Sequence, residues 1–253
     1  MITLLLALAW PFRVAVMKFS SPLIPGVLLQ RYKRFLADVQ LEDGSEITCS
    51  VPNTGSMLGL CTPGARIWLS RSDSPTRKYR HSWELSETNL GAGPVLAGIN
   101  TSLPNRLVEE AITAGVIQEL AGYPVLRREV RYGANSRIDL LLETAAGGRC
   151  YVEVKNVHMS RISGLSEFPD CVSTRAAKHL VELTQMVKEG NRAVMVYLIQ
   201  RADTSRFQLA GDMDPTYHAG FLAARAAGVE ALAYACDLRT DGIEVTGRLP
   251  MAM

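Results

Sequence analysis

The chain has 253 residues, which is enough to form one large hydrophobic core or two small ones. Hydrophobic residues make up 47% of the sequence and charged residues 21%, proportions that are ordinary for a folded soluble protein. The formal net charge of +2 excludes a globally basic protein, so any nucleic-acid site has to come from local clusters of Lys and Arg.

The N-terminal segment is apolar but does not predict a membrane anchor. Ile2–Trp10 is too short to span a bilayer, and it lacks the preceding Lys or Arg of a signal peptide. The segment can also form a strand or helix that packs on the barrel expected after it.

The cysteines indicate the cellular compartment. They are odd in number, far apart and without CxxC or His/Cys ligand spacing, which disfavours a disulfide framework and a zinc site. Scattered cysteines are typical of a reducing cytoplasm, where we expect the protein to act. The five positions are Cys49, Cys61, Cys150, Cys171 and Cys236.

Short strands separated by turns are predicted from Pro22 to Leu96. Glu42-Asp43-Gly44 and Thr62-Pro63-Gly64 are typical turn sequences. Strands of this length and spacing favour a small barrel. The candidate strands are Leu28–Gln40, Glu46–Ser50, Ala65–Ser70, Arg80–Leu85 and Val95–Leu96.

Two basic clusters in this region also contain aromatic residues. The first is Arg31-Tyr32-Lys33-Arg34-Phe35, and the second is Arg77-Lys78-Tyr79-Arg80-His81 with Trp83. Aromatic rings can stack on bases while Arg and Lys contact phosphates, as on single-strand binding surfaces. The alternative is that the aromatic residues are core and the cations are solvated. The candidate nucleic-acid contacts are Arg31, Lys33, Arg34, Arg77 and Lys78.

A helix is predicted after a linker region at Gly91–Gly98. Ser102 is the expected N-cap, and the helix is expected from about Leu103 to Ala114. Asn105 and Glu109 are four residues apart, so they share one face of this helix.

The segment from Arg137 to Val157 is predicted to form a β-hairpin. Arg137–Glu143 is rich in Leu and Ile, Thr144–Gly148 contains two glycines, and Arg149–Val157 alternates and is rich in Val. Side chains alternate between the two faces of a strand, so the hairpin register decides which polar groups meet.

Pairing of Glu143 with Arg149 would place Asp139 opposite Glu153. Lys155 lies two residues after Glu153 and therefore shares its face. The opposite face suits a core. Its residues are Ile138, Leu140, Leu142, Val152 and Val154.

This polar face is a candidate catalytic site. Asp139 and Glu153 would repel each other across the strands, and a divalent cation between them would remove the repulsion. Mg²⁺ is held in proteins by one or two carboxylates together with waters and a substrate phosphate. Lys155 could position the attacking water or neutralise charge in the transition state. The alternative is a solvated polar face with weak ion pairs.

The C-terminal half alternates helices with strands, which indicates an α/β layer structure. Ser160–Phe168 is predicted as a loop, and Asp214 as the N-cap of a helix that begins with Pro215. The remaining elements are a helix at Asp170–Val187, strands at Arg192–Gln200, Gly228–Asp237 and Gly242–Thr246, and the helix that ends near Ala227. On the first helix, one face can be shared by Arg175, Lys178, His179 and Glu182.

Asp139 followed by Glu153-Val154-Lys155 on the next strand resembles the core motif of the PD-(D/E)XK nuclease superfamily. From Met17 onward the whole chain resembles the sugar fermentation stimulation protein A (SfsA) family. Because the resemblance begins at Met17, it implies that residues 1–16 are an upstream extension or follow a misassigned start codon. The segments that carry the resemblance are RYKRFLADV at Arg31–Val39, PNTGSM at Pro52–Met57, SRID at Ser136–Asp139, VEVKNV at Val152–Val157 and FPDCVSTRAAKHL at Phe168–Leu180.

The resemblance implies a mixed α/β (α+β) fold and DNA binding. It implies a small OB-like β-barrel at residues 17–96 and a PD-(D/E)XK nuclease-like α/β domain at residues 97–253. Nuclease-like folds often add an acidic residue from the preceding helix to the metal site, which implies Glu109. The resemblance also implies Asn53 and Thr54 as ligand contacts. For phosphate contacts it implies Arg137, Arg175, Lys178 and His179.

Three functions are open on the sequence. The first is a nuclease acting on DNA or RNA, with Mg²⁺ or Mn²⁺ held by Asp139 and Glu153 and assisted by Lys155. The second is a non-catalytic DNA-binding regulator of sugar (maltose) utilisation genes, although no helix-turn-helix signature is present. The third is a small-nucleotide sensor. The Asp/Glu/Lys trio favours the first, because carboxylates beside a phosphate repel DNA unless a cation intervenes. No oligomeric state is predicted.

Overall fold

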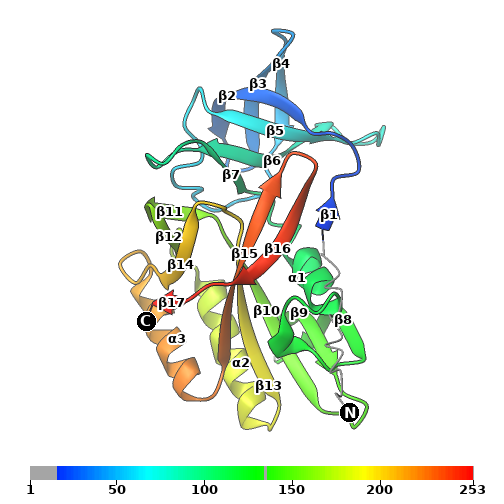
Figure 1. Ribbon diagram of the computed structural model, residues 1–253, viewed down its shortest axis with the longest axis vertical. Helices are drawn as coiled ribbons and strands as arrows, with labels where there is room; N and C mark the ends of the chain where they lie inside the picture. The colour runs from blue at the N-terminus through cyan, green and yellow to red at the C-terminus, as the bar shows by residue number, and fades with distance from the viewer. Residues whose placement is uncertain (1–15, 134–135, 253) are drawn as a thin grey trace, which may run out of the picture.

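A small barrel lies on top of a larger α/β part (Figure 1). The computed structural model describes residues 16–133 and 136–252. The prediction for residues 1–16 therefore lies, apart from Val16, outside the described residues. Among the described residues, no helix is long and apolar enough to cross a membrane.

Five strands close the predicted barrel, and a sixth extends its sheet. The strands are β2 (Ile24–Tyr32), β3 (Leu36–Leu41), β4 (Glu46–Ser50), β5 (Arg66–Arg71), β6 (His81–Thr88) and β7 (Val95–Gly98). Their order is β4-β3-β2-β5-β6-β7, and an additional pairing of β4 with β6 closes the barrel. Leu28, Val39 and Trp83 are fully buried inside it. The predicted small barrel is confirmed.

The first basic cluster forms a turn and not a continuous strand. The predicted strand Leu28–Gln40 reverses direction between β2 and β3, where Tyr32 pairs with Leu36. Lys33 and Arg34 have φ values of 50° and 65°. Left-handed backbone is uncommon for residues with a long side chain, so no Gly or Asn marked the turn in the sequence.

The described chain begins in the α/β part. β1 (Val16–Lys18) pairs antiparallel with β16 (Gly242–Arg248), and Met17 is buried in the core of that part. The assignment of residues 17 and 18 to the barrel is therefore wrong. Burial of Met17 stabilises the long-range pairing, which is not visible in local sequence. The division near residue 96 stays a prediction.

A seven-stranded mixed sheet is the centre of the α/β part. Its order is β1-β16-β15-β13-β10-β9-β8, and β10, β13 and β15 run parallel. The further strands are β8 (Val125–Tyr132), β9 (Ser136–Glu143), β10 (Arg149–Val157), β13 (Arg192–Ile199) and β15 (Glu230–Arg239). Parallel strands are usually buried on both faces, and β13 is apolar almost throughout for that reason.

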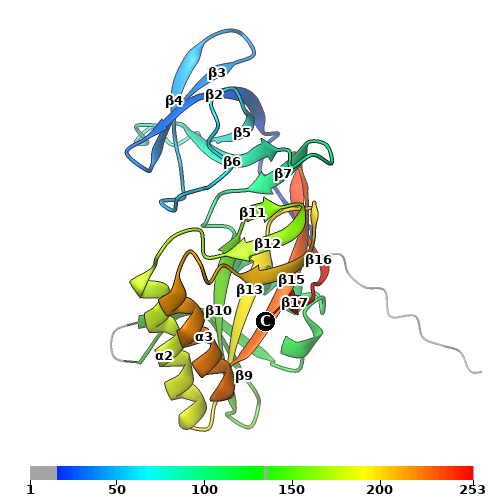
Figure 2. The ribbon, with the colours of Figure 1, turned by 90° about the vertical axis from the view of Figure 1, so that its left-hand side faces the viewer.

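Helices cover both faces of this sheet. The helices are α1 (Pro104–Thr113), α2 (Thr174–Lys188) and α3 (Pro215–Ala226), and a short 3-10 helix, η1 (Gln118–Leu120), follows α1. Figure 2 shows α2 and α3 side by side on one face. Val108 of α1 packs with Val152 and Val194 on the other face. Both faces of β10 are therefore covered at its centre, and Glu153 lies inside the protein.

Four of the five residues predicted for the apolar face of the hairpin share one face in the structure. Leu140, Leu142, Val152 and Val154 belong to the core on the α1 side. Ile138 instead belongs to the core beneath α2 and α3. The ladder between β8 and β9 has no pair at Asp139, and Glu129 on β8 has a φ of 52°. This irregularity changes the facing of β9 between residues 138 and 140.

The helix caps confirm one prediction and correct another. Asp214 caps α3 by accepting a hydrogen bond of 2.9 Å from the Tyr217 amide, as expected from its place before Pro215. Ser102 does not cap α1. Its hydroxyl donates instead to the Asn100 side chain, at 2.6 Å. Pro at the first helical position lacks an N–H group, which reduces the need for a cap there.

A second, four-stranded sheet corrects the predicted loop at Ser160–Phe168. Its strands are β11 (Met159–Ile162), β12 (Gly164–Phe168), β14 (Thr204–Leu209) and β17 (Met251–Ala252). Leu165 and Phe207 are buried beneath this sheet. Its strands come from distant parts of the chain, so local alternation within nine residues was too weak a signal.

The two parts are joined by backbone hydrogen bonds. The Gly98 amide donates to the Gln200 carbonyl, and the Thr101 amide donates to the Pro52 carbonyl, both at 3.0 Å. A Cβ atom on Gly98 would lie 2.3 Å from Oε1 of Gln200. Only glycine permits this approach, so the junction is closely packed.

Candidate active site

The hairpin register places the candidate catalytic residues together. Glu143 pairs with Arg149, as predicted, and the ladder continues to Leu140 opposite Val152. It ends there because the Asp139 carboxylate accepts a hydrogen bond from the Val154 amide at 2.8 Å. The Asp139 side chain thus takes the position that a backbone carbonyl would occupy.

Asp139 is held from two sides and is difficult to ionise. Besides the Val154 amide, the Asn105 side chain of α1 donates to its other oxygen at 2.9 Å. Burial and the negative charge of Glu153 raise the pKa of Asp139 to about 6, although both hydrogen bonds oppose the shift. The two carboxylates therefore repel each other.

Glu153 has one occupied oxygen and one free oxygen. Oε1 accepts a hydrogen bond from Lys155 Nζ at 2.7 Å and contacts Nδ1 of His179. Oε2 is buried and has no hydrogen-bond partner in the described part of the chain. Burial alone would raise the pKa of Glu153, but Lys155 and His179 outweigh it and lower the pKa. A buried, ionised and unpartnered oxygen is costly unless something binds it.

These side chains line a cavity of about 290 Å³ where the barrel meets the α/β part. The loop that follows β4, residues 51–57, is called the barrel loop, and it contributes Asn53. The helix α2 contributes Arg175. The lining is polar on most sides. Its residues are Asn53, Thr101, Pro104, Asn105, Asp139, Glu153, Val154, Lys155, Asn156, His158, Phe168, Asp170, Arg175 and His179.

Glu109 does not belong to this cavity, which corrects its prediction as a metal ligand. Its carboxylate forms an ion pair with Arg128 of β8. Asn105, one turn earlier on the same helix face, is the residue that reaches Asp139. Only the first turn of α1 lies beside the end of the hairpin ladder. Among the described residues, no group of three or more His, Cys, Asp or Glu side chains is arranged to hold a metal ion.

His179 is a neighbour of the carboxylates and not an exposed phosphate contact. It is 5% exposed, and its ring faces Glu153 across the space between α2 and β10. Arg175, one turn earlier, is exposed and lines the cavity, whereas Lys178 pairs with Glu182 at 3.4 Å. The helical spacing was read correctly, but packing of α2 on the sheet turned His179 inward.

The first basic cluster divides into one structural and two exposed cations. The Arg31 guanidinium donates to the carbonyls of Asn53, Gly55 and Ser56, at 2.9, 2.9 and 3.2 Å. Arg31 therefore holds the barrel loop in place. The prediction that Arg31 contacts phosphate is corrected, because its guanidinium is occupied by these carbonyls. The exposed cations of the turn are Lys33 and Arg34.

Asn53 and Thr54 have different environments. Asn53 is buried, accepts from the Gly55 amide and donates to the Ile99 carbonyl, so its side chain shapes the loop that lines the cavity. Thr54 is exposed, does not line the cavity, and accepts through its carbonyl a hydrogen bond from Arg34 at 2.9 Å.

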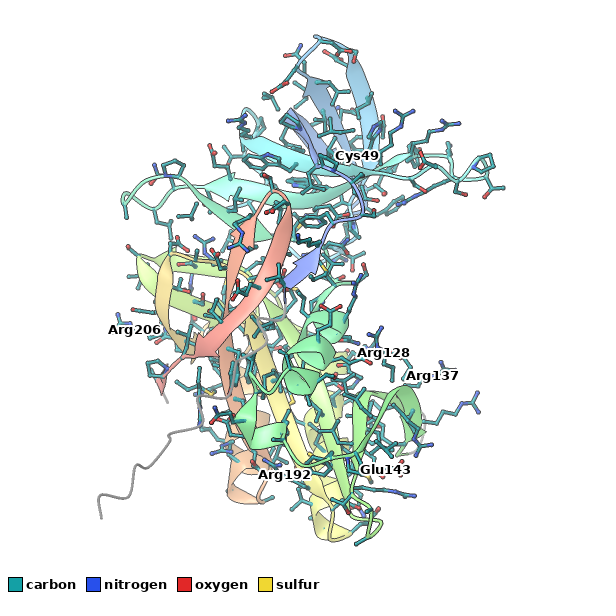
Figure 3. The ribbon with its side chains drawn as sticks, turned by 45° about the vertical axis from the view of Figure 1, so that its right-hand side comes forward. Cys49, Arg128, Arg137, Glu143, Arg192 and Arg206 are labelled. Atoms are coloured by element: carbon teal, nitrogen blue, oxygen red, sulfur yellow. The ribbon has the colours of Figure 1, made fainter. Side chains whose placement is uncertain are left out.

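The remaining predicted cations lie apart from the cavity. Arg77, in the loop between β5 and β6, donates to Ser50 and Ser82, and Lys78 of the same loop lies over the Tyr79 ring. Arg137 is exposed at the outer side of the sheet, where Figure 3 shows it pointing into solvent. These residues are not brought together with Asp139 and Glu153.

Two ionisable cavity residues, Asp170 and His158, were missed by the sequence reasoning. Asp170 of the α/β part accepts hydrogen bonds from the Met57 amide at 2.9 Å and from Ser56 at 3.0 Å. His158 lies beside it, with Nε2 at 3.5 Å from Oδ2. Asp170 lies within the FPDCVSTRAAKHL segment, but no spacing pattern connects it with residues 113 positions earlier.

Arg31→Ala should destabilise the protein by roughly 1–3 kcal/mol, because four backbone carbonyls, those of Arg34, Asn53, Gly55 and Ser56, lose a charged donor. Urea denaturation measures the change. Lys33→Ala is the matched control and should stay within about 0.5 kcal/mol of wild type, because Lys33 is exposed. Equal stability of the two variants would contradict the structural role of Arg31.

Asp170→Asn should show pH-dependent destabilisation. Burial alone would raise the pKa of Asp170, but His158, the Met57 amide and Ser56 hold it well below its ordinary 3.8. A lowered carboxyl pKa stabilises the fold above the unfolded-state pKa, and this contribution is lost as the pH falls. The variant should lose roughly 1–3 kcal/mol at neutral pH and approach wild type below about pH 4.

Denaturation curves over a pH series test this expectation. Asp241→Asn is the control, because that side chain is 75% exposed. A deficit of Asp170→Asn that stays constant down to acid pH would show that the ionised carboxylate does not fasten the junction.

The fold and the cavity define a class of protein: a barrel of the OB type joined to an α/β part that buries two carboxylates and a lysine. The chain belongs to the sugar fermentation stimulation protein (SfsA) family. The model of the SfsA N-terminal OB domain matches residues 29–98, and that of the sugar fermentation stimulation protein RE domain matches residues 102–242. The predicted family and the OB-like barrel are confirmed.

Relatives cover nearly the whole chain. A sugar fermentation stimulation protein homolog from Azorhizobium caulinodans is 57% identical over 235 residues, which are 93% of this chain and 99% of the homolog. The homolog from Brucella ovis is 56% identical, over 93% of this chain and 97% of its own length. The structure of Pyrococcus furiosus SfsA in complex with Ca²⁺ has a TM-score of 0.84 and 28% identity, over 94% of this chain and 98% of that chain.

Proposed function

We propose that this protein is a divalent-cation-dependent nuclease that hydrolyses phosphodiester bonds in nucleic acid. The observation that carries the proposal is Oε2 of Glu153, which lies beside the Asp139 carboxylate, is buried and has no hydrogen-bond partner among residues 16–133 and 136–252. A binding surface for DNA alone gains nothing from two buried carboxylates, because they repel phosphate. A hydrolytic site needs them to hold a cation.

The residues present fit Mg²⁺ or Mn²⁺. Asp139 and Glu153 would hold the ion, and two carboxylates are sufficient when waters and a substrate phosphate complete the coordination. When bound, such an ion supplies a more acidic water and stabilises the leaving oxygen. The relative solved with Ca²⁺ supports a divalent cation in this family.

The chain's own side chains have distinct parts in this proposal. Asn105 and the Val154 amide fix the direction of the Asp139 carboxylate. His179 and Lys155 hold Oε1 of Glu153, which would leave Oε2 available to a cation. Lys155 is 15% exposed and lines the cavity, so its ammonium can also neutralise charge on the phosphate.

Nucleic acid is the substrate class that the surroundings favour. The OB-type barrel presents exposed Lys33 and Arg34, and Arg175 adds a cation at the cavity itself. Cations that contact phosphates supply most of the sequence-independent affinity for nucleic acid. The choice between DNA and RNA is left to experiment.

A digestion panel tests the proposal. Wild type is incubated with single- and double-stranded DNA and RNA, with Mg²⁺, with Mn²⁺ or with EDTA. Cleavage of at least one substrate is expected only with a divalent cation, and Lys155→Ala should lack it. Absence of cation-dependent cleavage from the whole panel, together with unchanged DNA binding by Lys155→Ala, would favour a non-catalytic DNA-binding protein instead.

A further inference from the structure

We infer that the junction between the barrel and the α/β part takes single-stranded nucleic acid, with one base stacked on Phe35 and one unpaired nucleotide in the cavity. The inference rests on the proposed function, because it names the substrate class of the same site. The barrel loop that closes the cavity is what separates a single strand from a duplex.

The size of the cavity limits what can reach the carboxylates. Its volume of about 290 Å³ is at the lower end of ligand pockets, which span roughly 300–1,000 Å³. Asn53 forms the barrel side, Thr101 lies at the junction, and Lys155 belongs to the opposite part. This volume is comparable to that of one nucleotide unit. Enzymes with such pockets act on an unpaired nucleotide or extrude one from a duplex.

The barrel side of the cavity is a fixed wall and not a loose lid. Arg31 binds the carbonyls of Asn53, Gly55 and Ser56, and Asp170 holds the Met57 amide from the other part. A Cβ atom on Gly55 would lie 3.0 Å from both the Asn53 and the Asp170 side-chain oxygens. The loop is therefore packed against the α/β part without spare room. A duplex would have to displace it.

The turn between β2 and β3 provides a stacking surface next to this wall. Phe35 is 51% exposed, although large aromatic residues usually bury their rings. Its carbonyl accepts from the Val51 amide at 2.7 Å, and the Arg34 guanidinium donates to the Thr54 carbonyl, so the turn lies against the start of the barrel loop. The exposed ring has exposed Lys33 and Arg34 beside it.

This combination is characteristic of single-strand recognition. A base in a duplex is already stacked and paired, whereas an unpaired base is free to stack on an aromatic ring. Arg175, on the α/β side of the cavity, provides a further cation for the backbone. Among the described residues, neither Arg34 nor Arg175 forms an ion pair with a carboxylate.

Fluorescence anisotropy with the full chain tests the inference. The probes are a short labelled DNA strand, the same strand in a blunt duplex, and a duplex with an unpaired tail, each measured in Ca²⁺ and in EDTA. Ca²⁺ should strengthen binding of the single strand and of the tailed duplex by roughly tenfold or more, the scale of one contact to a charged group. Binding of the blunt duplex should not respond. An equal response of the blunt duplex would overturn the inference.

Phe35→Ala supplies the second measurement. It should weaken single-strand binding by roughly tenfold, the scale of one lost base–aromatic stack, and should leave blunt-duplex binding unchanged. Leu90→Ala is the matched control, because Leu90 is an exposed apolar residue in the loop between β6 and β7. If Phe35→Ala binds the single strand as tightly as wild type, no base stacks on Phe35, and the inference is overturned.

The two proposals fail in different ways. Cleavage of blunt duplexes as fast as single strands would overturn the single-strand inference and leave the nuclease intact. Phe35-dependent, Ca²⁺-strengthened binding of single strands without cleavage in the digestion panel would overturn the nuclease and support the inference. Binding of neither strand type would overturn both.

Discussion

Lys155→Ala should lower cation-dependent hydrolysis by roughly a hundredfold or more, the usual scale for a lost transition-state contact. The Lys155 ammonium contacts Oε1 of Glu153 and lines the cavity, so it lies where charge develops on the phosphate. Cation binding should remain, because both proposed carboxylate ligands are still present. The expected result is therefore a fall in turnover with the cation affinity largely retained.

Single-turnover cleavage and calorimetric cation titration separate these two effects. Lys188→Ala is the matched control, because Lys188 is exposed in the last turn of α2. It removes the same charge without touching the cavity, and it should cleave like wild type. A variant at position 155 that keeps normal turnover, or that loses cation binding and turnover in parallel, would contradict the assigned part of this lysine.

Glu153→Gln should abolish cation binding and hydrolysis together. The substitution preserves the shape of the side chain but removes the negative charge from the buried Oε2, which has no partner among the described residues. DNA binding without a cation should hold or tighten, because a charge that repels phosphate is gone. This opposite effect on binding and hydrolysis distinguishes a lost cation ligand from a misfolded protein.

Glu182→Gln is a strict control for this variant. Glu182 is also a buried glutamate of the α/β part, and it accepts a hydrogen bond from Ser136 outside the cavity. Both substitutions neutralise one buried carboxylate, so a common loss of folding would affect both. Cation affinity of Glu153→Gln equal to that of wild type would exclude Glu153 as a ligand.

The hairpin shows how far local sequence reaches. Its two strands are adjacent in the chain and are joined by a glycine-containing turn, so the pairing of Glu143 with Arg149 followed from spacing alone. Asp139 and Glu153 do line one cavity with Lys155, although the ladder ends at Leu140 opposite Val152 and does not pair Asp139 with Glu153. Alternation is a property of the strand itself, and it needs no knowledge of what packs on the sheet.

The helix α1 shows where this reasoning ends. Asn105 and Glu109 lie on the same face of the helix. From the sequence, the negative charge of Glu109 made it the better candidate for a metal ligand. The crossing of α1 over the hairpin decides that Asn105 reaches Asp139, while Glu109 pairs with Arg128. Helical periodicity determines which residues share a face but not which turn of that face meets the neighbouring sheet.

The sequence by itself determined the small barrel, the hairpin and its Asp/Glu/Lys trio, because each depends on periodicity or pairing between neighbouring segments. The OB type of the barrel followed from the family resemblance. Only the tertiary structure decided that Arg31 holds a loop while Arg34 stays exposed, and that Asp170 closes the junction on Met57. Arg31 and Arg34 are the same residue type and carry the same charge. They differ in which distant backbone carbonyls lie within reach, and packing of the whole chain determines that.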